Sequence, residues 1–132
     1  MKKVLVCFLF SFLFIGFAFG QNEASKKPVI TFVKDYFDFD TIPKGKQVTC
    51  KIEFTNTGRE PLIIKNVQAA CGCTVANWSK KPIKKNKRGF IEITYSATLI
   101  GAFSKSLIIE SNSTTPFRSI YVKGYVFDFT GY

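Results

Sequence analysis

The sequence contains no histidine, and its single methionine is the first residue. Without histidine the chain cannot form the Ser–His or Cys–His pair that activates many catalytic nucleophiles, and it lacks the commonest metal-binding side chain. Acidic side chains are also scarce, with nine Asp and Glu against 19 Lys and Arg. Asp38 and Asp40 lie two residues apart, without a second acidic pair to complete a metal cage. These absences predict a protein that is not an enzyme and holds no metal or cofactor.

Long apolar runs are absent except at the start of the chain. The run from Val4 to Phe19 is shorter than the roughly 20 residues that a membrane-spanning helix needs. Two lysines precede it and the small residues of Ala18-Phe19-Gly20 end it, which is typical of a secretory signal peptide. We therefore expect residues 1–20 to be cleaved off before Gln21, and the mature chain to be exported to the periplasm or beyond with no transmembrane segment. The alternative is an uncleaved membrane anchor.

The mature chain has no segment with helical periodicity. Between Gln47 and Thr55, apolar residues alternate with polar ones, as in a strand with one buried and one wet face. Similar short segments recur between turns rich in Gly, Pro, Asn and Ser, so the sequence predicts an all-β, immunoglobulin-like antiparallel β-sandwich of about seven strands. We expect a flexible segment at 21–28 and one domain over 29–132. The expected strands are Val29–Val33, Phe37–Phe39, Gln47–Thr55, Leu62–Val67, Phe90–Ser96, Leu107–Glu110 and Ile120–Val126.

Several short motifs follow one another in a recognisable order. They include Phe37-Asp38-Phe39, Phe54-Thr55-Asn56-Thr57-Gly58, Pro61-Leu62-Ile63-Ile64, Cys71-Gly72-Cys73-Thr74 and Gly89-Phe90-Ile91. Over roughly Phe32 to Val126 this order resembles the bacterial family called "domain of unknown function 1573". The resemblance implies an immunoglobulin-like sandwich, similar in shape to the ASH and MSP modules, in exported proteins. It implies no catalytic activity, because none is established for the family.

Two turn positions depart from the pattern of that family. Asp40 stands where the family usually has Gly, and Asn86-Lys87 stands where Pro-Gly is usual. Asn tolerates a positive φ angle, so the second change should be mild, whereas the first puts the local turn in question. Gly58, in the turn that ends the Gln47–Thr55 strand, is expected to adopt a positive φ angle.

Cys71-Gly72-Cys73 is the only chemically reactive motif in the mature chain. The favoured interpretation is structural, either a disulfide across a tight turn at Gly72 or a packed loop. The alternatives are a redox pair and a soft-metal site, for which the chain offers few further ligands. Cys50 shares the apolar face of its strand and should be a buried thiol, although export would also allow a bond from it to Cys71 or Cys73.

Six basic residues gather within a nine-residue loop that precedes a strand. They are Lys80, Lys81, Lys84, Lys85, Lys87 and Arg88. This loop could contact a polyanion such as an anionic glycan or a lipid headgroup, or it could simply be solvated. Trp78 lies just before it, and we expect its ring to pack between the two sheets rather than to serve as an exposed binding anchor.

Together these observations favour an exported, non-catalytic module that binds a protein or an anionic cell-surface polymer. The alternative is a thiol-redox or metal-handling protein that uses Cys71 and Cys73. Nucleic acid is not expected as a partner of an exported protein, and the sequence leaves the identity of the ligand and the oligomeric state open.

Overall fold

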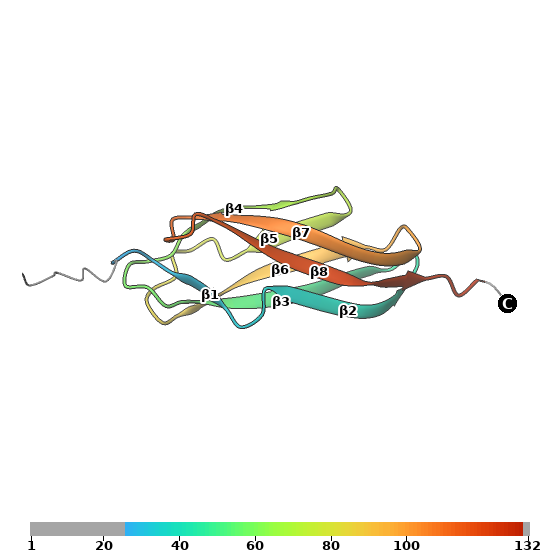
Figure 1. Cartoon of the computed structure of the whole chain (residues 1–132), viewed down its shortest axis with the longest axis horizontal. Helices are drawn as coiled ribbons and strands as arrows, with labels where there is room; N and C mark the ends of the chain where they lie inside the picture. The colour runs from blue at the N-terminus through green and yellow to red at the C-terminus, as the bar shows by residue number, and fades with distance from the viewer. Residues whose placement is uncertain (1–25, 131–132) are drawn as a thin grey trace, which may run out of the picture.

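The structure, a computed structural model, describes residues 26–130, which form eight β-strands and no helix (Figure 1). The strands are β1 (Ile30–Phe32), β2 (Tyr36–Pro43), β3 (Gln47–Asn56), β4 (Ile64–Ala69), β5 (Thr74–Trp78), β6 (Arg88–Ser96), β7 (Gly101–Ser111) and β8 (Phe117–Phe127). Within the described range no helix is long and apolar enough to span a membrane. The expected signal peptide, residues 1–20, lies outside the described residues and stays a prediction.

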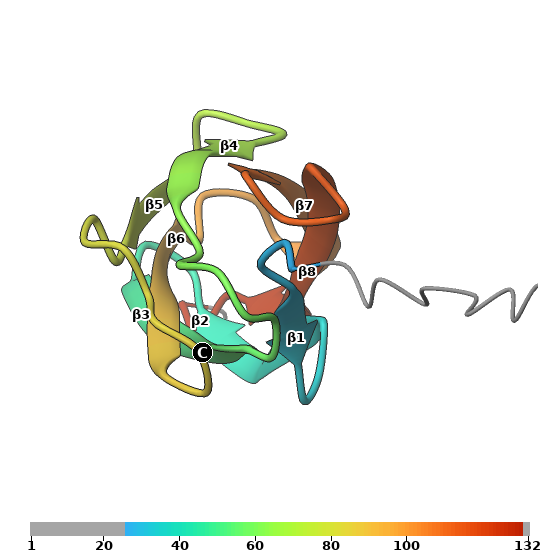
Figure 2. The same ribbon diagram turned by 90° about the vertical axis from the view of Figure 1, so that its left-hand side faces the viewer.

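The strands form two four-stranded sheets that face each other, as the end-on view in Figure 2 shows. One sheet has the order β1-β3-β6-β5 and the other has the order β2-β8-β7-β4. The immunoglobulin-like β-sandwich expected from the sequence is confirmed.

One strand pair departs from a wholly antiparallel arrangement. β2 pairs with β8 in parallel, with Tyr36 opposite Tyr121 and Ile42 opposite Val126. The reason is that the chain passes from one sheet to the other between β1 and β2 without reversing its direction. β2 therefore reaches the second sheet running the same way as β8, while all other pairs are antiparallel.

The core lies between the sheets, and the apolar residues that alternate with polar ones in β3 point into it. Cys50, Ile52 and Phe54 are buried, and the intervening Lys51 and Glu53 are exposed, as expected. They pack against buried residues of β6, β7 and β8, namely Ile91, Ile93, Leu107, Ile109, Ile120 and Val122. The contacts of the domain extend back into the segment expected to be flexible, because Pro28 is buried and the backbone oxygen of Lys26 accepts a hydrogen bond from Glu60.

Two strands differ most from the expectation, and β2 and β8 are also longer than expected. β5 was not expected at all, because its five residues follow a Cys-Gly-Cys turn and are too few to establish an alternation. β7 is much longer than Leu107–Glu110, because its first half is rich in small residues with weak strand preference. Both strands are held by backbone pairing with stronger neighbours, β5 with β6 and β7 with β8.

The loops gather at the two ends of the sandwich. One end, called here the basic end, carries the connections β3–β4 (57–63), β5–β6 (79–87) and β7–β8 (112–116), on the left of Figure 1. The opposite end, called here the cysteine end, carries the connections β2–β3 (44–46), β4–β5 (70–73) and β6–β7 (97–100). The fold therefore separates the two groups of residues that the sequence singles out.

Candidate functional site

A buried asparagine organises the basic end. Asn56 is fully buried at the end of β3, and its side chain makes four hydrogen bonds. Its Oδ1 accepts from the backbone N–H groups of Val29 at 3.2 Å and Gly58 at 3.0 Å. Its Nδ2 donates to the backbone oxygens of Glu60 at 2.7 Å and Ile83 at 2.8 Å. One amide thus satisfies its full hydrogen-bonding capacity while tying together β1, the β3–β4 loop and the β5–β6 loop.

The sequence predicts Asn56 only as part of a turn. A signal was nevertheless present, because Asn56 continues the inward-facing series of Cys50, Ile52 and Phe54. A polar side chain in that phase must find partners inside the protein. Gly58 in the same turn does not have the positive φ angle that was expected. It is required for space, because a Cβ atom there would lie 2.6 Å from the Cα of Pro28.

The β5–β6 loop is anchored to the sandwich at its middle and at its end. Ile83 is buried and exchanges two backbone hydrogen bonds of 2.8 Å with Leu62. Asn86 has a φ angle of 61°, a conformation that Asn tolerates, as expected. Its backbone N–H donates a hydrogen bond of 2.7 Å to the backbone oxygen of Asn56. The lysines between these anchors are therefore carried on a loop with a defined path.

The loop residues 79–87 carry five lysines and no acidic residue. All five lysines are exposed, as is Arg88 at the start of β6. Among the ion pairs of the described residues, the only one that involves this basic run joins Arg88 to Glu53 at 3.7 Å. Lys81, Lys84, Lys85 and Lys87 therefore present uncompensated positive charge at the basic end.

A groove of about 430 Å³ lies beside the start of the loop. Its lining residues are Asn77, Trp78, Ser79, Lys80, Lys81 and Phe90. The Lys80 ammonium group lies over the Trp78 ring, 3.0 Å from its centroid, and Lys51 lies 4.4 Å from the centroid of Phe90. Trp78 contacts the core cluster but is only half-buried, because it belongs to the edge strand β5. The sequence predicts a ring packed between the two sheets and gives no sign of the groove.

The cysteines lie away from this surface. Cys71 and Cys73 form a disulfide in the β4–β5 turn, at the cysteine end, and this bond is compatible with both the structural and the redox interpretation of the motif. Cys50 is a free, buried thiol, as expected, and is not bonded to either of them. Burial raises the pKa of Cys50 to about 11, which keeps it in the neutral, unreactive form at physiological pH.

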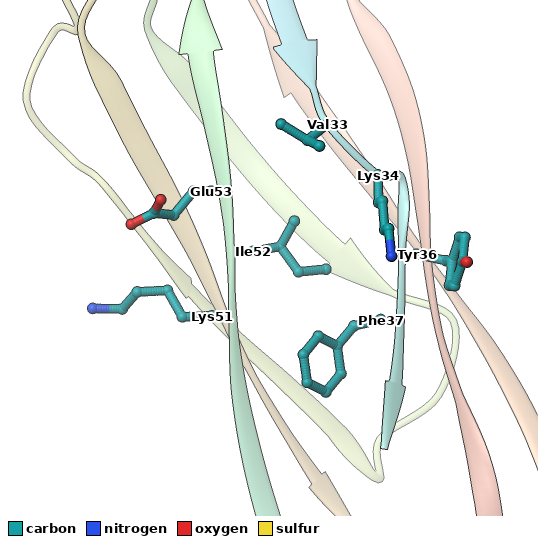
Figure 3. A pocket seen from close by; sticks show the side chains of 7 residues that line it. All are labelled: Val33, Lys34, Tyr36, Phe37, Lys51, Ile52 and Glu53. Atoms are coloured by element: carbon teal, nitrogen blue, oxygen red, sulfur yellow. The ribbon is translucent and has the colours of Figure 1, made fainter. Parts of the chain in front are cut away.

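A second cavity, of about 340 Å³, opens where the chain crosses from β1 to β2 (Figure 3). Ile52 and Phe37 face each other across it, whereas Lys51 and Glu53 extend to the other side of β3. Its rim includes the exposed Val33. The charged side chains of β3 point away from this space, so the two side chains that face each other across it, Ile52 and Phe37, are both apolar.

Two four-stranded sheets packed over one apolar core, with loops gathered at both ends, define an immunoglobulin-like β-sandwich. The sequence assigns the protein more closely. Residues 30–126 match the family described as "Protein of unknown function (DUF1573)", and the chain belongs to that family. No curated protein matches the sequence.

Solved structures support the fold assignment. A protein of unknown function from Porphyromonas gingivalis W83 superposes with a TM-score of 0.67 at 21% identity, over 82% of this chain and 51% of that one. This chain therefore spans about half the length of that protein. The ASH/PapD-like domain 7 of human CEP192 gives a TM-score of 0.64 at 10% identity, covering 78% and 88% of the two chains. The CsuC–CsuE chaperone–tip adhesion subunit complex of Acinetobacter baumannii gives 0.52 at 16% identity, covering 76% and 57%.

Proposed function

We propose that this protein is an exported, non-catalytic module that binds an anionic surface polymer or an acidic protein through its basic end. The observation that carries the proposal is the β5–β6 loop, on which five exposed lysines have no acidic neighbour in sequence. Uncompensated charge of one sign on a fixed loop attracts ligands of the opposite sign and raises their rate of association.

The way the loop is anchored supports a role in binding. Asn56 fixes it at Ile83, and the pairing of Ile83 with Leu62 holds its middle against the β3–β4 loop. An anchored loop loses less conformational entropy when a ligand arrives, so more of the electrostatic attraction remains as affinity. The fold is compatible with such a role, since one solved neighbour is a chaperone in complex with an adhesion subunit.

The proposal is tested by binding to an immobilised anionic polymer, with a neutral polymer as reference. Replacing Lys84, Lys85 and Lys87 by Gln removes three charges without touching an ion pair or a buried group. The variant is expected to lose at least about tenfold in affinity, since each partly screened contact contributes a fraction of a kcal/mol. If wild type and variant are retained equally, the basic end is not the binding surface.

A second candidate function is thiol–disulfide exchange at the cysteine end. It is favoured by the disulfide between Cys71 and Cys73, both of which are only half-buried. In this reaction a substrate thiolate attacks one sulfur atom and forms a mixed disulfide, and a second substrate thiolate then displaces the protein sulfur. The substrate dithiol is oxidised to a disulfide, and the Cys71–Cys73 disulfide is reduced to two thiols. With glutathione disulfide supplied to re-form the Cys71–Cys73 bond after each cycle, turnover of a dithiol peptide by wild type, abolished in a Cys71→Ser, Cys73→Ser variant, would establish this function in place of the first.

A further inference from the structure

We infer that the groove beside Trp78 is a subsite for one ring of an acidic polysaccharide. This inference rests on the proposed function, because it names the class of polymer that the basic end binds. Its basis is a combination of features that the β5–β6 loop alone does not have: two aromatic rings, a free amide and lysines at the rim, in a groove of about 430 Å³. Ligand sites of this kind combine an apolar surface with a few polar groups that fix orientation.

The aromatic rings give the groove an apolar lining. Trp78 is held from behind by the core cluster, and the backbone of Phe90 makes two hydrogen bonds with Ser79. The Phe90 N–H donates to Ser79 Oγ at 3.0 Å, and the Ser79 N–H donates to the Phe90 oxygen at 3.1 Å. The Trp78 ring, backed by the core, loses little entropy on binding, and the C–H groups of a sugar ring can pack against it.

Lys80 couples the apolar lining to charge. In the free protein its ammonium group lies 3.0 Å from the centroid of the Trp78 ring, where it gains a cation–π interaction. A ligand carboxylate or sulfate competes for this ammonium group and draws it toward the rim. The move uncovers the ring for the sugar to which that anion is attached, so ring contact and charge recognition occur together.

The polar rim suits hydroxyl groups. Asn77 is exposed and lines the groove, and no hydrogen bond within the described residues uses its side-chain amide. An amide offers both a donor and an acceptor, which matches a pair of sugar hydroxyls. Lys81, on the same rim, supplies a second positive charge.

Other anionic partners fit this surface less well. A membrane surface would pair with the lysines but has no ring to place in the groove beside Trp78, and the large aliphatic side chain of the loop, Ile83, is buried and cannot insert. An acidic peptide would pair with the lysines of the loop and would make no use of a groove lined by aromatic faces. An acidic polysaccharide uses both features, with one ring in the groove and further charges along Lys84, Lys85 and Lys87.

The test uses four probes and the fluorescence of Trp78, which is the only tryptophan in the chain. The probes are hexagalacturonate, its fully methyl-esterified form, hexaglutamate, and vesicles containing phosphatidylglycerol. They separate rings with charge, rings without charge, charge without rings, and a lipid surface. We expect hexagalacturonate to shift the emission of Trp78 and to bind at least about tenfold more tightly than the ester or hexaglutamate, because only it engages the groove and the lysines together.

Two variants locate the binding. Lys80→Gln should weaken binding of hexagalacturonate several-fold, whereas Lys34→Gln, at an exposed lysine that also lies over an aromatic ring but does not line the groove, should leave it unchanged. Equal binding of hexaglutamate and hexagalacturonate with no change in Trp78 emission would overturn the sugar subsite and leave the polyanion-binding function intact. Binding to vesicles without binding to hexagalacturonate would also overturn it. Failure of every soluble anion to bind would remove the proposed function itself.

Discussion

The side-chain amide of Asn56 donates a hydrogen bond of 2.8 Å to the backbone oxygen of Ile83, 27 residues further along the chain. This bond joins the end of β3 to the middle of the loop that carries the lysines. The same side chain also holds the start of β1 and the β3–β4 loop. The Asn56-Thr57-Gly58 segment, which is one of the motifs shared with the family, therefore supports the loops of the basic end.

Replacing Asn56 by Ala should be strongly destabilising. The change removes four hydrogen bonds and leaves three backbone groups without a partner, the N–H groups of Val29 and Gly58 and the oxygen of Glu60, since the Ile83 oxygen keeps its bond from Leu62. Each unsatisfied buried group costs about 1–3 kcal/mol. We expect the free energy of unfolding to fall by at least about 3 kcal/mol in denaturant titrations. Asn66→Ala, an exposed position on β4, is the control and should change it by less than about 0.5 kcal/mol. An Asn56→Ala variant as stable as the control would show that the amide network is not needed.

The register of β3 is tested by two aspartate substitutions on opposite faces. Ile52→Asp places an unpaired carboxylate in the core and should cost several kcal/mol, a large part of a typical stability of about 5–15 kcal/mol. Thr49→Asp lies on the exposed face and loses only a hydrogen bond to the Thr94 hydroxyl, so it should cost less than about 1 kcal/mol. Thermal melts in which the two variants unfold together would contradict the register.

Asp40 occupies a conformation that favours glycine. Its φ angle is 61°, and the pairing of β2 with β8 shifts register at this point. Asp40→Ala and Asp40→Gly remove the same carboxylate and differ only in the Cβ atom, which is unfavourable at positive φ. The Gly variant should therefore be the more stable of the two by about 1 kcal/mol in chemical denaturation. An equal stability, or a more stable Ala variant, would show that this turn relaxes freely.

The buried thiol of Cys50 predicts a pH dependence. Burial favours its neutral form and raises its pKa to about 11, from 9.0 when it is exposed. Its stabilising contribution is therefore complete below about pH 9 and is lost as the pH rises through 11. Relative to a Cys50→Ala variant, the wild type should lose about 2 kcal/mol of stability between pH 8 and pH 10.5. Parallel pH profiles for the two proteins would indicate that the thiol is accessible to solvent.

The sandwich could be predicted from sequence because apolar and polar residues alternate clearly in strands such as β3. The alternation from Gln47 onward gives the inward face of β3, and turn residues separate the strands. β5 could not be predicted, because its edge position depends on pairing with β6 rather than on its own five residues. The parallel pairing of β2 with β8 depends on where the chain crosses from one sheet to the other, and this point cannot be predicted from a local sequence pattern.

The candidate site was predicted only in part. The charge of the β5–β6 loop is visible in the sequence, and so are the two cysteines that form the disulfide at the other end. The groove is not visible, because it requires Lys80 to fold back over Trp78 while Phe90 approaches from the neighbouring strand. The role of Asn56 required knowing which three segments meet at the end of β3.

The most direct test of binding through the basic end is the salt dependence of affinity for an anionic polymer. The slope of log K against log salt concentration reports the number of charges that the protein neutralises. Replacing Lys84, Lys85 and Lys87 by Gln should make this slope shallower by about 2–3, close to one for each lysine removed. A control variant with Lys34, Lys46 and Lys105 changed to Gln, all away from the basic end, has the same net charge and should keep the slope of the wild type. Identical slopes for the two variants would contradict the account, because binding would then depend on overall charge rather than on the loop.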